Sequence, residues 1–311
     1  MARRIRIWKE HAMYHATYNC IDRMFLLKPS KKVNNIIGSC LARAIQRYPV
    51  RLHSCTTNIN HLEIIYSLIS GKLNNASSFL QYFAGLVARE LNRLLGREGH
   101  LWSTRARVEE IISDNKAEKL LGYGACNPVK DGLVDKAKDW EGFSTNNAIA
   151  KGQKLVFEYE NRTKWWKSGA DHKPVDPKEY MEQIEMVVHP IPSFKKLSKS
   201  QRQKRFRQII HNHEAIARRD RRAEGITQVK GMARIRRESP FSKPKRPRQK
   251  TPQPLCHADT KSAYLAYEAE YKEIAERHRK ASIAYRRGHF HIEFPKGTFR
   301  PPLVTVYQSA A

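Results

Sequence analysis

Two short stretches carry side chains whose types and spacing could do chemistry on a phosphate. In the first, TTNINHLEIIYSL, His61 and Glu63 lie two residues apart within an apolar run rich in β-branched residues. Residues i and i+2 of a strand face the same way, so an imidazole and a carboxylate would stand side by side. A divalent cation such as Mg²⁺ or Mn²⁺ accepts both, although it needs a further ligand. The alternative is a solvated pair on a half-exposed strand.

The second stretch is LLGYGACNPVKDGLV, in which Tyr123 and Asn127 lie four residues apart. On a helix, this spacing puts them on one face. A phenolic oxygen can attack a phosphate and hold it covalently, and an amide oxygen can complete a metal shell. The alternative is an aromatic core residue followed by an asparagine that caps the end of the helix. Spacing alone leaves both interpretations open.

The hydrophobic pattern around these stretches predicts the elements that must position them. Asp114 is the expected N-cap of the helix that carries Tyr123, and Asn127-Pro128 its expected end. The order β-α-β-β-α-β-α predicts an α+β fold, a ferredoxin-like sandwich with a central antiparallel sheet and one extra helix. The expected strands are 13–20, 50–57, 61–68 and 105–112, and the expected helices are 32–48, 74–95 and 115–126.

Beyond residue 145 the pattern is weaker, and we expect a mainly helical or partly disordered basic extension. Residues 151–159 fit a strand or a short helix, 174–186, 197–223 and 258–287 fit helices, and 290–294 fit a short strand. The expected organisation is a compact domain at 1–145, a basic extension at 146–237, a linker rich in Pro, Lys and Arg at 238–256, and a C-terminal helix and tail at 257–311.

The charge points to a polyanionic partner. The chain has 58 Lys and Arg against 30 Asp and Glu, a formal net charge of +28. Trp165 and Trp166 lie in the basic segment RTKWWK, where they could stack on unpaired bases or anchor the extension on the core. The basic residues expected to contact DNA are Arg105, Arg107, Lys130, Arg202, Lys204, Arg205, Arg207, Arg218, Arg219, Arg221 and Arg222. The alternative for the densest of these is a solvated tail.

Other features narrow the class. The five cysteines show no CxxC pairing, which argues against a disulfide framework or a zinc knuckle. The basic start MARRIRIWKEHAMYH lacks the apolar segment of a signal peptide, and no apolar run approaches the length of a membrane span. We therefore expect a cytoplasmic, nucleoid-associated DNA-binding protein, a monomer or homodimer, with no membrane partner.

Several motifs carry a family resemblance. YHATYNCIDRMFLL, NINHLEII, FAGLVARELNRLLGREGHLWSTR, YGACNPVKDGLV and DWEGFST follow one another over residues 14–145. Together they resemble the single-tyrosine HUH transposases, especially the REP-associated tyrosine transposases and their relatives with long basic C-terminal extensions. The resemblance implies a nuclease domain at 1–145 that acts on single-stranded or hairpin DNA with Mg²⁺ or Mn²⁺.

The resemblance also implies roles for individual residues. His61 would be the first metal ligand on the strand, Asn127 the ligand on the helix, and Tyr123 the nucleophile that leaves a 5′-phosphotyrosine and a free 3′-hydroxyl. The chain departs from the family in having Glu63 at the second histidine of the HUH motif. Carboxylate oxygen is a good ligand for Mg²⁺ or Mn²⁺, so metal-dependent cleavage is compatible with this change.

Two alternatives to a working enzyme follow from the same residues. Gly122 and Gly124 flank Tyr123, and each weakens a helix by about 1 kcal/mol relative to Ala. They predict either a mobile tyrosine helix or a decayed transposase that only holds hairpin or single-stranded DNA. A basic RNA-binding protein is a third interpretation. The histidines of HNH, 211–213, and HFH, 289–291, are interpreted as surface residues outside the sandwich.

Overall fold

A four-stranded antiparallel sheet forms the centre of the molecule. The computed structural model describes residues 4–151, 153–169, 176–244 and 253–303. Its first half contains β1 (Met13–Asn19), α1 (Lys31–Arg47), β2 (Arg51–Thr57), β3 (His61–Ser67), α2 (Asn75–Leu94), β4 (Arg107–Ile111) and α3 (Asp114–Lys130). The strands lie in the order β2-β3-β1-β4, and each neighbouring pair is antiparallel. This is the ferredoxin-like order, and the predicted α+β fold class is confirmed.

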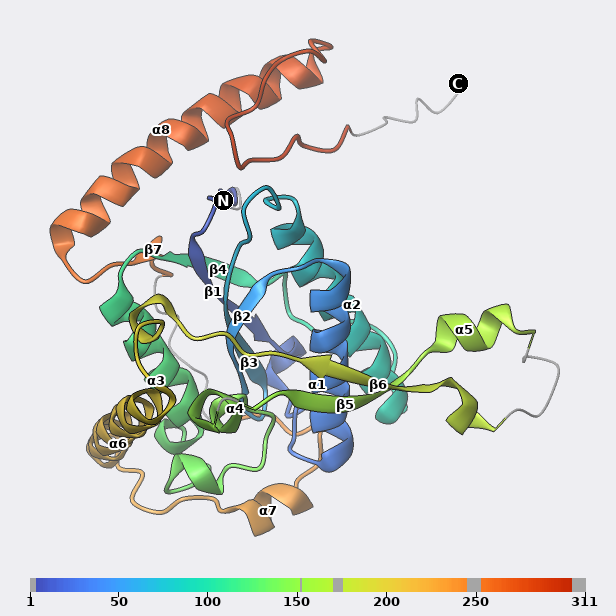
Figure 1. Cartoon of the computed structure of the whole chain (residues 1–311), viewed down its shortest axis with the longest axis vertical. Coiled ribbons are helices and arrows are strands. Elements are labelled where there is room, and N and C mark those ends of the chain that lie inside the picture. The colour runs from blue at the N-terminus through green and yellow to red at the C-terminus, as the bar shows by residue number, and fades with distance from the viewer. Residues whose placement is uncertain (1–3, 152, 170–175, 245–252, 304–311) are drawn as a thin grey trace.

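The two faces of the sheet differ in chemistry because side chains alternate along each strand. Tyr14, Tyr66 and Leu62 belong to the large apolar core that also includes residues of α1 and α2. The opposite face carries His15 and Glu63 and is covered by α3 and by α6 (Lys199–Ala223). Figure 1 shows α1 and α2 on one side of the sheet and α3 and α6 on the other. The helices α3 and α6 therefore cover the polar face of the sheet.

α3 differs from its prediction at both ends. Its N-cap is Ser113, whose hydroxyl accepts from the Lys116 amide, and not Asp114. The helix also continues through Pro128 to Lys130. Proline lacks the N–H that would bond one turn back, but a single missing bond in the last turn does not end a helix. Asn127 is therefore a helical residue and not its cap.

The second half is less purely helical than expected. The segment 181–186 is strand β6 and not a helix, and it pairs antiparallel with β5. In it Ile184 and Met186 are buried at period-two spacing, the signature of a strand. Residues 290–294 form no strand. The remaining elements are α4 (Asn146–Lys151), β5 (Leu155–Glu160), α5 (Arg162–Lys167), β6 (Met181–Met186), α7 (Met232–Arg237), β7 (Cys256–His257) and α8 (Lys261–Arg286), with short 3-10 turns at Ile21–Arg23, Ala137–Asp139, Pro177–Tyr180 and Pro192–Phe194.

The β5–β6 hairpin is fastened to α1. A Cβ on Gly38 of α1 would lie only 2.2 Å from Phe157, so the ring packs directly on the helix backbone. Asn35 donates to the Glu158 carbonyl at 2.8 Å and accepts from the Glu158 amide at 3.0 Å. These contacts hold the base of the hairpin, while α5 at its far end stands away from the sheet (Figure 1).

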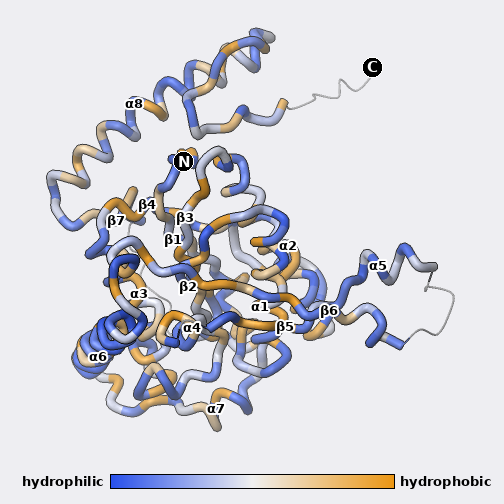
Figure 2. Tube along the Cα trace, in the orientation of Figure 1, coloured by the Kyte–Doolittle hydropathy of each residue, from blue (hydrophilic) through white to orange (hydrophobic). Residues whose placement is uncertain are grey.

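β7 was not expected, and it brings the C-terminal region back to the sheet. It runs parallel to β4, with Cys256 opposite Glu110 and His257 opposite Ile111. Beyond it α8 leaves the core, and Figure 2 shows both α6 and much of α8 as hydrophilic. The boundaries at residues 145, 237 and 256 stay predictions, and 245–252 of the expected linker lie outside the described residues.

The cysteines and the helix lengths add two observations. All five cysteines are buried and free of disulfide bonds. Among the residues that the structure describes, no helix is both long and apolar enough to cross a membrane.

Candidate metal and nucleophile site

The three predicted metal ligands meet on the polar face of the sheet. The Asn127 Nδ2 atom lies 2.9 Å from His61 Nε2 and donates to Glu63 Oε1 at 3.1 Å. His61 Nε2 and Glu63 Oε1 are 4.0 Å apart. All three residues are buried, so the interpretation of His61 and Glu63 as a solvated pair is wrong. The interpretation of Asn127 as a helix cap is also wrong, because the C-cap is Asp131.

A neighbouring asparagine orients the His61 ring. His61 Nδ1 lies 2.9 Å from Asn60 Oδ1, an oxygen that can only accept. The proton therefore belongs on Nδ1, and Nε2 carries the lone pair that faces Asn127 and Glu63. An unprotonated Nε2 is what a metal requires, and such an outer hydrogen bond is how metal-binding histidines are usually held. A half-turn of the Asn127 amide would present Oδ1 in place of Nδ2.

The glycines beside Tyr123 have packing roles. A Cβ on Gly124 would lie 3.0 Å from Thr56 Oγ1 and 3.2 Å from Glu63 Oε2. A Cβ on Gly122 would lie 2.2 Å from the ring of His213 on α6. The two glycines therefore let α3 lie close to both the sheet and α6. Their presence needs neither a mobile helix nor a decayed enzyme.

Sequence reasoning missed three further residues on the same face. His15 Nε2 lies 3.5 Å from Glu63 Oε2, and His15 Nδ1 lies 3.9 Å from Glu109 Oε2. The His257 ring lies 5.3 Å from the His15 ring, centre to centre. His15 and Glu109 are direct register partners of β1 and β4. The sequence signal that could have found His15 was the alternation of side chains along β1. It places His15 on the same face as Thr17, whose register partner on β3 is Glu63.

The charges of these residues depend on one another. Burial alone would lower the pKa of His15, but Glu63 and Glu109 raise it above its ordinary value. Burial raises the pKa of Glu109, against the opposing effect of His15. Burial, His15 and Lys116 together lower the pKa of His257 to about 4. The pKa of His15 is therefore shifted upward by its carboxylate neighbours, whereas that of His257 is shifted downward far enough to leave His257 neutral at pH 7.

Tyr123 lines a cavity of about 530 Å³ between α3, α6 and β7. His257 and His213 line the same cavity, as do the basic residues Lys119 and Arg205. The Lys130 ammonium lies 5.3 Å from the centre of the Tyr123 ring. The phenol is therefore partly buried in a basic environment that suits a phosphate, and His257 connects this cavity to His15 and Glu63.

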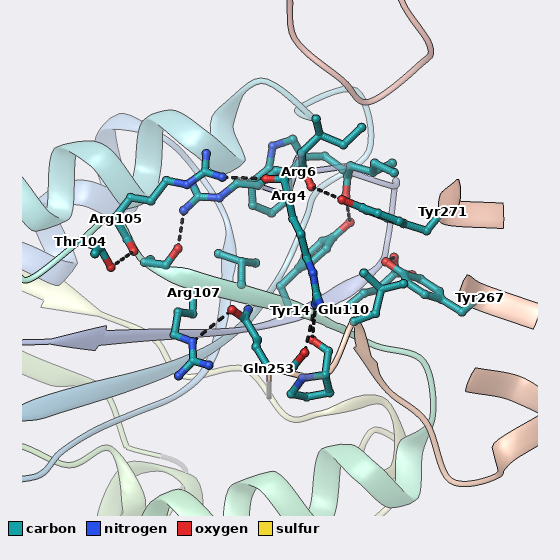
Figure 3. A pocket seen from close by; sticks show the side chains of 17 residues that line it. Arg4, Arg6, Tyr14, Thr104, Arg105, Arg107, Glu110, Gln253, Tyr267 and Tyr271 are labelled. Atoms are coloured by element: carbon teal, nitrogen blue, oxygen red, sulfur yellow. Dashed lines mark hydrogen bonds between the residues drawn. The ribbon is translucent and has the colours of Figure 1, made fainter. Parts of the chain in front are cut away.

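Arg105 and Arg107 line a second cavity, of about 350 Å³, formed by the N-terminal segment, β4, residues 253–255 and α8. Figure 3 shows Arg107 bonded to Gln253, and Arg105 beside Arg4. The Arg107 Nε donates to Gln253 Oε1 at 3.1 Å, and an Arg105 guanidinium nitrogen donates to the Arg4 carbonyl at 2.7 Å. Both side chains are exposed and keep further donors for a phosphate.

The basic residues of α6 differ in their exposure and in the contacts that they make. Arg221 is 3% exposed and donates to the carbonyls of Val129 and Val134, so its assignment as a DNA contact is wrong. Arg221 instead fixes α6 to the end of α3. Several others are committed to contacts within the protein: Arg202 to the Leu197 carbonyl, Arg205 to Glu118 and Arg218 to Glu214. The exposed residues of the set are Lys204, Arg205, Arg207, Arg219 and Arg222.

Of the two tryptophans, Trp166 does not anchor the extension on the core. Trp166 is 67% exposed on α5, and Trp165 is partly exposed beside it. The base of the hairpin is held by Phe157 and Asn35 instead. Of the other histidines considered, His289, His291 and His211 are exposed, whereas His213 packs against Gly122.

No protein-family model and no curated protein matches the chain. Among the solved structures that match it are two transposases. The structure of the REP-associated tyrosine transposase bound to a REP hairpin is 21% identical and covers 49% of this chain and 87% of that chain, with a TM-score of 0.41. A candidate transposase from Deinococcus radiodurans R1 is 14% identical and covers 39% of this chain and 95% of that chain, with a TM-score of 0.29.

Proposed function

We propose that the chain is a transposase-like enzyme that cuts and rejoins single-stranded DNA through Tyr123. The observation that carries this proposal is the meeting of His61, Glu63 and Asn127, which come from a strand and from the helix of the tyrosine. One nitrogen and two oxygens suit Mn²⁺ or Mg²⁺. When bound, such an ion would polarise the scissile phosphate and offset the charge of Glu63.

The residues of the chain supply the rest of the reaction. The Tyr123 oxygen attacks phosphorus and forms a phosphotyrosine, while the bond from phosphorus to the 3′ oxygen breaks. The phenol proton passes to solvent water as the oxygen attacks, and the 3′ oxygen takes up a proton from solvent water and departs as a hydroxyl. Reversing these two steps rejoins the strand. Lys130 lies 5.3 Å from the centre of the Tyr123 ring, and Lys119 and Arg205 at the cavity attract phosphates.

Binding of the DNA follows from the exposed cations. The exposed residues of α6 and Arg105 and Arg107 would neutralise phosphates, so affinity should fall with salt. Trp166, on an exposed basic helix, is placed to stack on an unpaired base. The partner is therefore DNA with single-stranded or hairpin ends, and the protein acts in the cytoplasm as a monomer or homodimer.

A DNA-binding protein without cleavage is the second candidate. Glu63 and Glu109 put two carboxylates close to the expected phosphate position, and both flank His15. Without a cation, that charge repels DNA. This candidate retains hairpin affinity and predicts no covalent product.

The test is Tyr123→Phe, which removes the attacking oxygen and keeps the ring. With a hairpin-flanked single strand and Mn²⁺, the unaltered chain should form a covalent protein–DNA adduct that survives denaturing electrophoresis. Tyr123→Phe should lose the adduct and the nick while DNA affinity stays within about twofold, since no phosphate contact is removed. Tyr48→Phe, at the end of α1, is the matched control. An adduct in Tyr123→Phe would assign the nucleophile elsewhere, and no adduct in the unaltered chain with any divalent ion would favour the second candidate.

A further inference from the structure

We propose that His15, Glu109 and His257 form a transition-metal site, best suited to Zn²⁺ and separate from the ligand set of His61, Glu63 and Asn127. The three residues come from β1, β4 and β7, and one ligand atom of each lies within 4.8 Å of the others. The strands β1, β4 and β7 are neighbours in the sheet, and β7 is the edge strand, where the C-terminal region returns (Figure 1).

The state of His15 is the strongest argument. Its side chain is only 9% exposed, and neither ring nitrogen has a hydrogen-bond partner. Leaving one buried polar group unpaired costs about 1–3 kcal/mol. The gap of 3.9 Å between His15 Nδ1 and Glu109 Oε2 is too long for a hydrogen bond. Ligands about 2.1 Å from a tetrahedral ion stand roughly 3.4 Å apart, so this gap suits two ligands of one cation after a small contraction.

The other two ligands support the same reading. His257 Nε2 is buried and also lacks a hydrogen-bond partner. Gln253 donates to Glu109 Oε1 at 2.6 Å and accepts from Arg107 Nε at 3.1 Å. One carboxylate oxygen is thereby occupied, and the other, Oε2, faces His15. Outer hydrogen bonds of this kind orient metal-binding carboxylates.

The donor set selects the ion and suggests its role. Two imidazoles and one carboxylate suit Zn²⁺ and leave a fourth position for water, whereas Mg²⁺ prefers oxygen ligands. β7 holds only two residues and pairs with β4 at two positions. A cation shared by His15, Glu109 and His257 would tie β7 to the core sheet, and with it the start of α8. The site therefore stabilises the return of the C-terminal region, whether or not Tyr123 cuts DNA.

The test uses the full chain, stripped with a chelator and titrated with Zn²⁺ by calorimetry, with Co²⁺ as a spectroscopic substitute. The unaltered chain should bind Zn²⁺ at this site and gain thermal stability. Glu109→Gln and His257→Ala should each weaken this binding at least about 100-fold and abolish the visible Co²⁺ band. Gln253→Ala keeps all three ligands and should weaken it about tenfold.

Two controls locate the ion. His61→Ala removes the other ligand set, and a double variant, His289→Ala with His291→Ala, removes two exposed histidines; both should keep this Zn²⁺ site. The proposal is overturned if Zn²⁺ affinity is unchanged in Glu109→Gln and His257→Ala, or if binding disappears in either control. If His257→Ala loses its fold by circular dichroism, Glu109→Gln, which keeps the shape of the side chain, decides alone. Because the readout is metal binding, DNA cleavage does not enter the result.

Discussion

The histidines of β2 and β3 and the histidine of β1 are all buried but are held in opposite ways. His53 has a partner at each ring nitrogen, the His189 carbonyl at 3.0 Å and Ser67 Oγ at 2.9 Å. His61 also has two, Asn60 and Asn127. His15 has no hydrogen-bond partner and lies between two carboxylates.

The difference shows that the partners of a buried histidine matter more than its burial. The backbone carbonyl that holds His53 cannot turn away, so that ring has a structural role. The Asn127 amide that holds His61 can rotate and offer its oxygen, so that ring is available to a metal. His15 has carboxylates beside it but no hydrogen bond to lose, and a cation would bind one of its nitrogens. Each prediction below changes one of these arrangements.

The largest effect is expected at Glu63, which lies between the two histidines His61 and His15. Glu63→Ala should reduce Mn²⁺-dependent nicking at least about 100-fold, since it removes a charged metal ligand. Glu63→His should retain part of the activity, because imidazole is also a ligand. Initial rates on a hairpin-flanked strand measure both, with Glu98→Ala as an exposed control. Full activity in Glu63→Ala would remove Glu63 from the metal site.

Local patterns predicted most of the first half of the fold. Side chains alternate along β3, so His61 and Glu63, two residues apart, share one face of the strand independently of the tertiary structure. The four-residue spacing of Tyr123 and Asn127 does the same on α3. The side chains of His61, Glu63 and Asn127 meet because these local rules agree with the ferredoxin-like order of the strands. The end of α3 was misjudged because a proline near a C-terminus weakens a helix without stopping it.

The His15 cluster could not be predicted in the same way. His15 and Glu109 become neighbours only through the register of β1 and β4. His257 joins them through a strand of two residues, too short to show any periodicity. Arg221 was misassigned for a related reason: in a basic helix, composition does not tell which guanidinium turns inward to bond the carbonyls of another helix.

The second largest effect is expected from pH acting on His53. Burial lowers the pKa of His53 to about 4, against the opposing bond to the His189 carbonyl. The unfolded chain binds a proton near pH 6.5 and the folded one only near pH 4, so stability falls as the pH drops through that window. The free energy of unfolding should be lower by roughly 2–3 kcal/mol at pH 4.5 than at pH 7.5.

Denaturant unfolding at pH 7.5 and pH 4.5 measures this loss. His53→Gln can still bond Ser67 and has no proton to gain, so the variant should be less sensitive to pH than the unaltered chain by that amount. Equal pH sensitivity of the two chains would show that His53 does not carry the effect.

A smaller effect is expected where α3 touches the site. Gly124→Ala places a Cβ 3.2 Å from Glu63 Oε2 and 3.0 Å from Thr56 Oγ1, two buried groups with little room to move. The destabilisation from crowding should be larger than the stabilisation from the higher helix propensity of Ala. The free energy of unfolding should therefore fall by about 1 kcal/mol. Gly85→Ala in α2 meets nothing within 4 Å and should gain about 1 kcal/mol. Urea unfolding compares the two, and a gain in both would show that the contact with Glu63 is loose.

The last effect, on metal affinity alone, is expected at Asn60, which sets the proton of His61 and is not one of the three proposed ligands. Asn60→Ala frees Nδ1, so the ring divides between two tautomers and two orientations. Mn²⁺ affinity, measured by paramagnetic resonance, should fall about tenfold, while Zn²⁺ binding by the His15 cluster stays unchanged. Asn58→Ala is the matched control: it lies in the same turn and bonds Asp131 at 2.9 Å, away from the ring. If Asn60→Ala and Asn58→Ala lower the Mn²⁺ affinity equally, the turn as a whole supports the site. If only Asn60→Ala does so, the tautomer of His61 is what its neighbour supplies, and the contrast with the unpartnered His15 holds.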